Sequence, residues 1–219
     1  MDIKVDFNTL IVFDLDDTLY NELDYLISGY KCIASYIDKT KEREIFSVMF
    51  SLYRNNQDVF EYLSGVYPVQ KENLLSIYRN HKPSLSLDYS VLELFQILKT
   101  KSVKLALLTD GRSITQRNKL RALGIQEMFD YISISEEIGE VKPSLKGFQL
   151  IQNEFKREDC YYIGDNLLKD FIAPNKLNWK TICLIDNGKN IHHHSQEKLD
   201  VGKLPNYYIY SLKDIRIIS

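Results

Sequence analysis

The sequence predicts an α/β fold in which a parallel-sheet core carries an inserted helical subdomain. From about residue 85 onward, short apolar segments alternate with helical patterns, which is typical of strands joined by helical crossovers. Residues 20–83 break this alternation, because their apolar residues recur only at helical spacing. The predicted core therefore spans residues 1–19 and 84–219, and the predicted helical subdomain spans residues 20–83.

Six short apolar segments predict the strands of the sheet. They are rich in β-branched and aromatic residues and are too short for helices. The segments are 9–13, 103–108, 131–135, 160–163, 181–184 and 207–210. Most of them alternate little with polar residues, as expected for strands that are covered on both faces of a parallel sheet. We therefore expect right-handed crossovers between them.

Four helices are predicted between these strands, at residues 90–100, 114–123, 143–155 and 170–177. Ser90 and Glu93 have the spacing of a capping box, which predicts the start of the first helix. Gly124 is expected to end the second helix in the left-handed conformation. Pro143 and Pro174 fit only near the first turns of the last two helices, because proline has no N–H group.

The stretch of residues 20–83 is expected to form three to four helices inserted after the first strand. No part of it predicts a convincing strand, and its apolar residues recur at the three- and four-residue spacing of a helix. These residues are Leu23, Leu26, Ile27, Tyr30, Ile33, Ile37, Ile45, Phe46, Met49, Phe50 and Tyr53.

The composition argues against several classes of protein. The 219 residues carry 28 Lys and Arg against 30 Asp and Glu, a net charge of −2, without the basic excess of a nucleic-acid-binding protein. No apolar run approaches the roughly 18 residues that span a bilayer, and the N-terminus does not resemble a signal peptide. Three cysteines without a CxxC pair suit a reducing compartment. We therefore expect a cytoplasmic protein that binds neither a membrane nor nucleic acid.

Carboxylates, a threonine and a lysine lie at or after the points where the predicted strands end. Because ligands bind beyond the carboxyl ends of parallel strands, these side chains are expected to meet in one site. The residues are Asp14, Asp16, Thr109, Asp110, Lys142, Asp165 and Asp170. These segments contain no His or Cys, and a site of oxygen ligands favours Mg²⁺ over Zn²⁺.

This combination of groups suits phosphoryl transfer. A divalent cation and Lys142 would offset the mutual repulsion of Asp14, Asp16 and Asp165. One aspartate can attack phosphorus and form an aspartyl phosphate. A second aspartate two residues later faces the same side and can act as general acid and base.

Four motifs in this order resemble those of the haloacid-dehalogenase-like (HAD) hydrolase superfamily. They are DLDDT at 14–18, TDG at 109–111, Lys142 and GDNLLKD at 164–170. The helical insertion resembles the small cap of the family, and the resemblance covers the whole chain. It implies a Rossmann-like core and a cap that excludes water and recognises the leaving group.

The resemblance implies a role for each motif residue. Asp14 would be the nucleophile and a magnesium ligand, and Asp16 would be the general acid and base while its backbone carbonyl binds the metal. Asp165 would complete the protein ligands of the metal. Lys142 would stabilise charge on the nucleophile and the phosphate, and Asp170 would support the metal's water shell or Lys142. Phosphoryl oxygens would be held by the Thr109 hydroxyl and by the backbone N–H groups of Leu15, Asp16 and Asp110.

Asp16 discriminates within the superfamily, because dehalogenases typically lack Asp at this position and transport ATPases carry Thr. The resemblance thus implies a phosphatase that hydrolyses small phosphomonoesters, either nucleotide or sugar phosphates, through an aspartyl-phosphate intermediate. A sugar phosphomutase on the same scaffold and a non-catalytic phospho-acceptor module are alternatives. A monomer and a homodimer are both compatible with the sequence.

Several residues also have purely structural interpretations. Asp170 could cap its helix, Lys142 could be a solvated loop residue, and Asp17 is expected to cap a helix or turn. Arg112 is expected at the surface. The histidines at 192–194 lack the i, i+4 spacing of helical metal ligands and predict a surface loop. Packing or solvation is expected for four residues of the helical subdomain, Tyr25, Lys31, Arg54 and Arg79.

Overall fold

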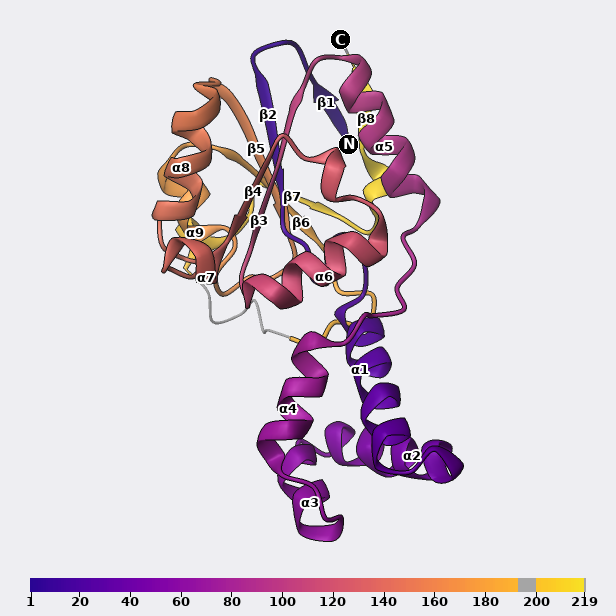
Figure 1. Ribbon diagram of the computed structural model, residues 1–219. Helices are drawn as coiled ribbons and strands as arrows, with labels where there is room; N and C mark the ends of the chain where they lie inside the picture. Colours follow the sequence, from indigo (N-terminus) through magenta and orange to yellow (C-terminus); the bar gives the residue numbers. More distant parts are fainter. Residues whose placement is uncertain (193–199, 219) are drawn as a thin grey trace.

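The computed structural model describes residues 1–192 and 200–218 and contains a six-stranded parallel sheet in the order β4-β3-β2-β5-β6-β7 (Figure 1). Its strands are β2 (Thr9–Phe13), β3 (Lys104–Thr109), β4 (Tyr131–Ile134), β5 (Asp159–Gly164), β6 (Lys180–Leu184) and β7 (Tyr207–Ile209). All six coincide with predicted segments to within one residue at each end. The predicted fold class, a parallel-sheet Rossmann-like core with inserted helices, is confirmed.

Helices cover both faces of this sheet. They are α5 (Tyr89–Thr100), α6 (Ser113–Leu123), α7 (Ser135–Ile138), α8 (Lys146–Phe155) and α9 (Ile172–Lys176). In β2, Ile11 and Phe13 belong to the apolar layer beneath α5 and α6, whereas Leu10 and Val12 belong to the layer beneath α8 and α9. Side chains alternate between the faces of a strand, so a central strand with two covered faces requires a continuous apolar run.

Three helix starts differ from the prediction. The predicted capping box at Ser90 is wrong, because the Asp88 side chain caps α5 by accepting a hydrogen bond from Ser90 N at 2.8 Å. Helix α8 starts after a turn, three residues later than Pro143, and α9 starts two residues later than Asp170. The predicted end of α6 is confirmed, since Gly124 has φ +69°, which suits a residue without a side chain.

The chain between β2 and α5 forms a group of helices that Figure 1 shows gathered beyond one end of the sheet. The helices are α1 (Glu22–Ile37), α2 (Glu42–Arg54), α3 (Val59–Val66) and α4 (Lys71–Asn80), with a short 3₁₀ turn at Lys39–Lys41. They pack around their own apolar cluster, to which Leu26, Ile33, Met49, Leu63 and Leu74 contribute. The predicted absence of a strand here is confirmed, and the division of the chain at residues 19–20 and 83–84 stays a prediction.

Two short strands were not predicted, β1 (Asp2–Lys4) and β8 (Arg216–Ile218). They pair in parallel as a separate two-stranded sheet, and Arg216 binds Asp2 through two hydrogen bonds. Three residues are too few to show a periodic pattern. No helix among the described residues is both long enough and apolar enough to cross a bilayer.

Candidate active site

Three neighbouring strands bring the predicted site residues together at the carboxyl edge of the sheet. Asp14 follows β2, Thr109 ends β3 and Asp165 follows β5, and β2 pairs with both other strands. These residues line a cavity of about 120 Å³. Its lining consists of Asp14, Asp16, Asp17, Glu22, Thr109, Asp110, Asp165, Asn166, Lys169 and His192. The expected convergence of the separate motifs is therefore present in the structure.

Lys142 reaches Asp14 from inside the protein, with an Nζ to Oδ1 distance of 2.9 Å. Its ammonium group also contacts Asp170 Oδ1 at 2.8 Å and donates a hydrogen bond to the Tyr162 hydroxyl at 3.0 Å. These three partners match the three N–H donors of a lysine, whose side chain is 2% exposed. Burial lowers the pKa of Lys142, but Asp14 and Asp170 outweigh it and hold the pKa well above its usual value. The alternative of a solvated loop lysine is wrong.

Asp170 positions its neighbours instead of capping α9, whose N-cap residue is Phe171. Its Oδ1 contacts Lys142, and its Oδ2 accepts hydrogen bonds from the backbone N–H groups of Asp165 and Asn166 at 3.1 and 2.9 Å. A Cβ atom at residue 164 would lie 2.5 Å from Asp170 Oδ2, so this close approach requires Gly164. Both carboxylate oxygens of Asp170 are therefore engaged by the protein.

Asp14, Asp165 and Asp170 form a compact acidic cluster in which one oxygen from each lies within 4.8 Å of the others. Burial raises the pKa of Asp14 to about 7, although Lys142 acts in the opposite direction. Burial, followed by repulsion from Asp170 and Asp14, raises the pKa of Asp165 to about 9. A cation beside these groups would favour their ionised forms. The site thus fits a divalent ion, because it offers clustered oxygen ligands with excess negative charge.

Asp16 is held by three donors from two parts of the chain. Its Oδ1 accepts from Lys119 Nζ at 2.7 Å and from the Tyr20 hydroxyl at 2.5 Å, and its Oδ2 accepts from Gln116 Nε2 at 2.8 Å. Burial raises the pKa of Asp16. The charge of Lys119 and the three hydrogen bonds lower it by more than burial raises it, so the pKa lies below its usual value. The three hydrogen bonds therefore fix the orientation of the Asp16 carboxyl group.

Three of the phosphate-binding candidates, Asp16, Thr109 and Asp110, line the same cavity. Thr109 is buried, and its hydroxyl accepts a hydrogen bond from Gln116 Nε2 at 2.6 Å. Asp110 accepts from the backbone N–H of Lys142 at 3.1 Å and from Lys169 Nζ at 3.0 Å, which joins three of the four motif segments. Leu15 is fully buried and its side chain packs in the apolar core, so that side chain cannot contact a ligand.

Sequence reasoning missed four residues that surround Asp16: Tyr20, Glu22, Gln116 and Lys119. Gln116 and Lys119 lie on the buried face of α6 together with Leu120 and Leu123. Polar side chains at positions of an apolar helical stripe are the signal that could have identified them. Glu22 pairs with Lys119 at 3.6 Å and lines the cavity from the first turn of α1.

Other candidates lie where structural roles explain them. Arg112 is half-exposed and pairs with Glu136 at 3.6 Å, as expected for a surface residue. The Tyr25 hydroxyl donates to the backbone carbonyl of Tyr78, as expected for packing. Asp17 accepts a hydrogen bond from Glu22 N, at the start of α1. His192 lines the cavity, whereas residues 193 and 194 lie outside the described part of the chain.

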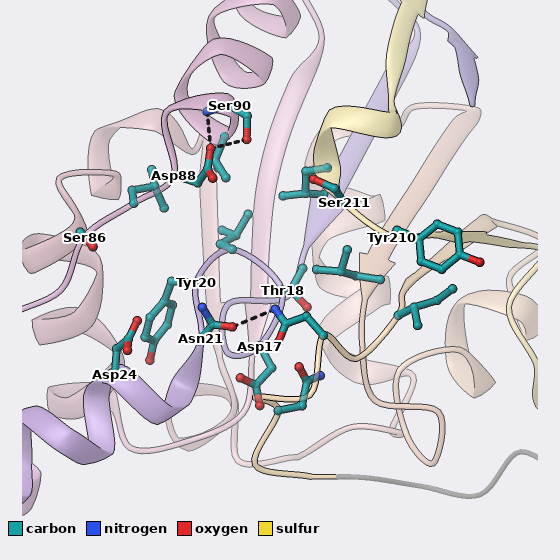
Figure 2. A pocket seen from close by; sticks show the side chains of 18 residues that line it. Asp17, Thr18, Tyr20, Asn21, Asp24, Ser86, Asp88, Ser90, Tyr210 and Ser211 are labelled. Carbon is teal, nitrogen blue, oxygen red and sulfur yellow. Dashed lines mark hydrogen bonds between the residues drawn. The ribbon is translucent and has the colours of Figure 1, made fainter.

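A second cavity, of about 340 Å³, lies where the starts of α1 and α5 approach the segments after β6 and β7 (Figure 2). Asp17 belongs to its lining and to that of the smaller cavity. Figure 2 shows Asp88 in this lining, engaged with the backbone and hydroxyl of Ser90. The Asp14–Lys142 pair does not line this cavity, so its larger size does not make it the reactive site.

The fold and the site together define an α/β protein with a buried acidic cluster at the carboxyl edge of its sheet. The sequence model for haloacid dehalogenase-like hydrolases matches residues 11–184. The glyceraldehyde 3-phosphate phosphatase of Methanocaldococcus jannaschii is 30% identical over 221 residues, which cover 94% of each chain. The pyrophosphatase PpaX of Bacillus thuringiensis is 28% identical over 166 residues, 71% of this chain and 74% of its own. The chain belongs to the haloacid dehalogenase-like hydrolase family.

Solved structures agree with this assignment at the level of the fold. The HAD-hydrolase YfnB of Bacillus subtilis, in a form bound to magnesium, superposes with a TM-score of 0.68 at 19% identity. The match covers 94% of this chain and 96% of that structure. The predicted superfamily and the predicted enzyme class, an HAD-type phosphatase, are confirmed by these relatives together.

Proposed function

We propose that the protein is a magnesium-dependent phosphatase that hydrolyses small phosphomonoesters through a phosphorylated Asp14. The observation that carries this proposal is the buried Asp14–Lys142 pair, in which Asp14 belongs to the acidic cluster and lines the same cavity as Asp16. An aspartate can attack phosphorus, a lysine can neutralise the transferred group, and a second aspartate can move the proton.

The proposed reaction has two steps. In the first, a carboxylate oxygen of Asp14 bonds to phosphorus while the ester P–O bond breaks, and the leaving alcohol takes a proton from Asp16. In the second, Asp16 accepts a proton from water as the water oxygen attacks phosphorus, which releases inorganic phosphate and restores Asp14. Lys142 stabilises the charge on Asp14 and on the phosphoryl group throughout.

The phosphoryl oxygens would be held at the ends of β2 and β3. In this proposal, the Thr109 hydroxyl donates to one oxygen, and the backbone N–H groups of Leu15, Asp16 and Asp110 bind the others. Magnesium would be held by Asp14, Asp165 and the backbone carbonyl of Asp16. Bound there, it would supply positive charge to the transferred phosphoryl group. Asp170 would orient this site, because its oxygens are occupied by Lys142 and by two backbone N–H groups.

The proposed substrates are small, polar phosphate esters, with triose-sized sugar phosphates favoured over nucleotides. The cavity of about 120 Å³ is below the roughly 300–1,000 Å³ of pockets for drug-sized ligands. Asp, Glu, Asn, Thr, Lys and His line it, and no Phe, Tyr or Trp among residues 1–192 and 200–218 offers it a ring on which a base could stack. The relative of Methanocaldococcus jannaschii named as a glyceraldehyde 3-phosphate phosphatase supports the same size class. Residues 20–83 would act as the cap that recognises the leaving group.

Phosphate release from a panel of triose, sugar and nucleotide phosphates tests this proposal. We expect turnover that stops with EDTA and returns with Mg²⁺, and that is reduced by on the order of 10⁴-fold or more in Asp14→Asn. The folded state of the variant is checked by circular dichroism. Substantial turnover by Asp14→Asn, or activity that resists the chelator, would contradict the proposed chemistry.

The same assay separates the alternatives. A sugar phosphomutase would require a bisphosphate activator and would return the phosphoryl group to its sugar, so steady release of inorganic phosphate without activator argues against it. A phospho-acceptor module would incorporate phosphate once and turn over slowly. Burst and steady-state phases, measured with acetyl phosphate and with triose phosphates, distinguish these outcomes from repeated hydrolysis.

A further inference from the structure

Lys119 is a buried lysine to which the proposed reaction assigns no role. It lies on α6, its side chain is 3% exposed, and it does not line the catalytic cavity. Its ammonium group contacts Asp16 Oδ1 at 2.7 Å and Glu22 Oε1 at 3.6 Å, and lies 4.5 Å from the centre of the Tyr25 ring. A buried ammonium is costly unless it is paired, so these contacts account for its position.

The contacts of Lys119 join two separate parts of the chain. Asp16 belongs to the catalytic loop after β2, whereas Glu22 and Tyr25 belong to α1 of the inserted helices. Lys119 itself comes from a core helix about a hundred residues later in the sequence. A displacement of α1 relative to the core would therefore remove two of the groups that surround this ammonium.

The orientation of Asp16 depends on these same contacts. Tyr20 donates to the oxygen that Lys119 binds, and Gln116 donates to the other oxygen. Gln116 also donates to the Thr109 hydroxyl, so the donors that fix Asp16 reach a proposed phosphate-binding group. Lys119 is the donor among them that carries a charge, and charge-assisted hydrogen bonds are roughly twice as strong as neutral ones.

We propose that Lys119 is a positioning residue that orients Asp16 for proton transfer and links this orientation to the position of α1. The proposal rests on the proposed function, in which Asp16 protonates the leaving group. Lys119 does not touch the substrate in this arrangement. Its effect is exerted through Asp16 and should therefore depend on how much the leaving group needs a proton.

Two substrates that differ in this need provide the test. The alcohol of glycerol 3-phosphate is a poor leaving group that must be protonated, whereas the phenolate of p-nitrophenyl phosphate departs without a proton. The ratio kcat/KM reports the steps up to departure of the leaving group and excludes the later hydrolysis of the aspartyl phosphate. In Lys119→Met, we expect kcat/KM to fall by about tenfold or more for the glycerol ester and by less than about threefold for the aryl ester.

Matched variants separate positioning from general damage. Lys169→Met removes another lysine near the cavity that binds Asp110 and not Asp16, so both esters should lose activity by the same factor. Lys119→Arg keeps a cation at the position, so its kcat/KM for the glycerol ester should be much closer to that of the wild type than the value for Lys119→Met. Thermal unfolding of each variant shows whether the protein remains folded. If Lys119→Met does not fold, Lys119→Gln, which keeps a neutral donor, should show the same selective loss to a smaller degree.

Equal losses for the two esters in the folded variants would overturn the proposal, and so would an unchanged ratio in Lys119→Met. An effect of Lys119→Met that persists undiminished in the Asp16→Asn background would also overturn it, because a residue acting through Asp16 has no effect without that group. Failure of the wild-type protein to hydrolyse either ester is a different result, which contradicts the proposed function. Crystal structures of the wild type and of Lys119→Met would then still show whether Lys119 sets the orientation of Asp16.

Discussion

The α/β core and the inserted helices differ in what they bury. The core buries charge: Asp14, Lys142 and Asp170 are each at most 6% exposed and contact one another. Helices α1–α4 bury an apolar cluster in which aromatic rings pack edge to face, such as Tyr30 against Tyr53. Among the described residues, Glu22 is the one from these helices that lines the small acidic cavity beside Asp14 and Asp165.

This difference follows from the geometry of each part. Several loops converge at the carboxyl edge of a parallel sheet, so residues from distant segments can satisfy one another's charges there. A small group of amphipathic helices has a single apolar interior and offers no such convergence. We therefore expect the chemistry to depend on the core and the selection of the leaving group to depend on the helices.

The largest effect is expected from Asp16→Ala in the core. It removes the proposed proton donor, so kcat/KM for an alkyl phosphate should fall by about 10²–10⁴-fold. Slower hydrolysis of the aspartyl phosphate should appear as accumulation of phosphorylated protein in rapid-quench experiments. An alkyl phosphatase rate equal to that of the wild type would remove Asp16 from the reaction.

The next largest effect is expected from Asp165→Asn, which removes one charge from the acidic cluster. Magnesium should raise the thermal midpoint of the wild type, and the variant should need far more magnesium for the same shift. The affinity should decrease by more than the 10–100-fold that is typical when residues supporting a metal ligand are lost. Glu137→Gln, on the outer surface of the core, is the matched control. Equal magnesium titrations of Asp165→Asn and the wild type would refute the assigned ligand.

A smaller effect on catalysis is expected from Met49→Ala in α2. Met49 is fully buried in the cluster of α1–α4, so its truncation should lower the free energy of unfolding by about 2–5 kcal/mol. Hydrolysis of p-nitrophenyl phosphate at a permissive temperature should change by less than about threefold, because the site lies in the core. Val48→Ala, at a position that is 37% exposed, should cost less than about 0.5 kcal/mol. A loss of chemistry as large as that of Asp16→Ala would break the division.

The smallest effect is expected from Glu22→Gln and concerns the pH dependence of stability. Burial, followed by repulsion from Asp16, raises the pKa of Glu22 to about 8 from its ordinary value of 4.5. The folded state thus holds this proton more tightly than the unfolded state, so stability should fall as the pH rises from about 4.5 to 8. Glu22→Gln should reduce that slope in chemical denaturation without magnesium. An unchanged slope in Glu22→Gln would show that Glu22 does not titrate in this way.

Some features could be predicted because they depend on local sequence. The apolar run at 9–13 and the aspartates that follow it specify a buried strand with carboxylates at its end, whatever surrounds them. The end of α6 at Gly124 is equally local, because a left-handed residue favours glycine. The start of α5 was assigned wrongly, since Asp88 and Ser90 both offer a capping oxygen and only the path of the chain chooses between them.

The sequence alone determined the order of the strands along the chain, the position of the helical insertion and the motifs that carry the reactive groups. Only the tertiary structure decided that Asp170 binds Lys142 and two backbone N–H groups, and that α6 supplies Lys119 and Gln116 to Asp16. The physical reason is that a buried charge takes its partners from whatever packs against it. Those partners lie up to about a hundred residues away in the chain, beyond the reach of any local pattern.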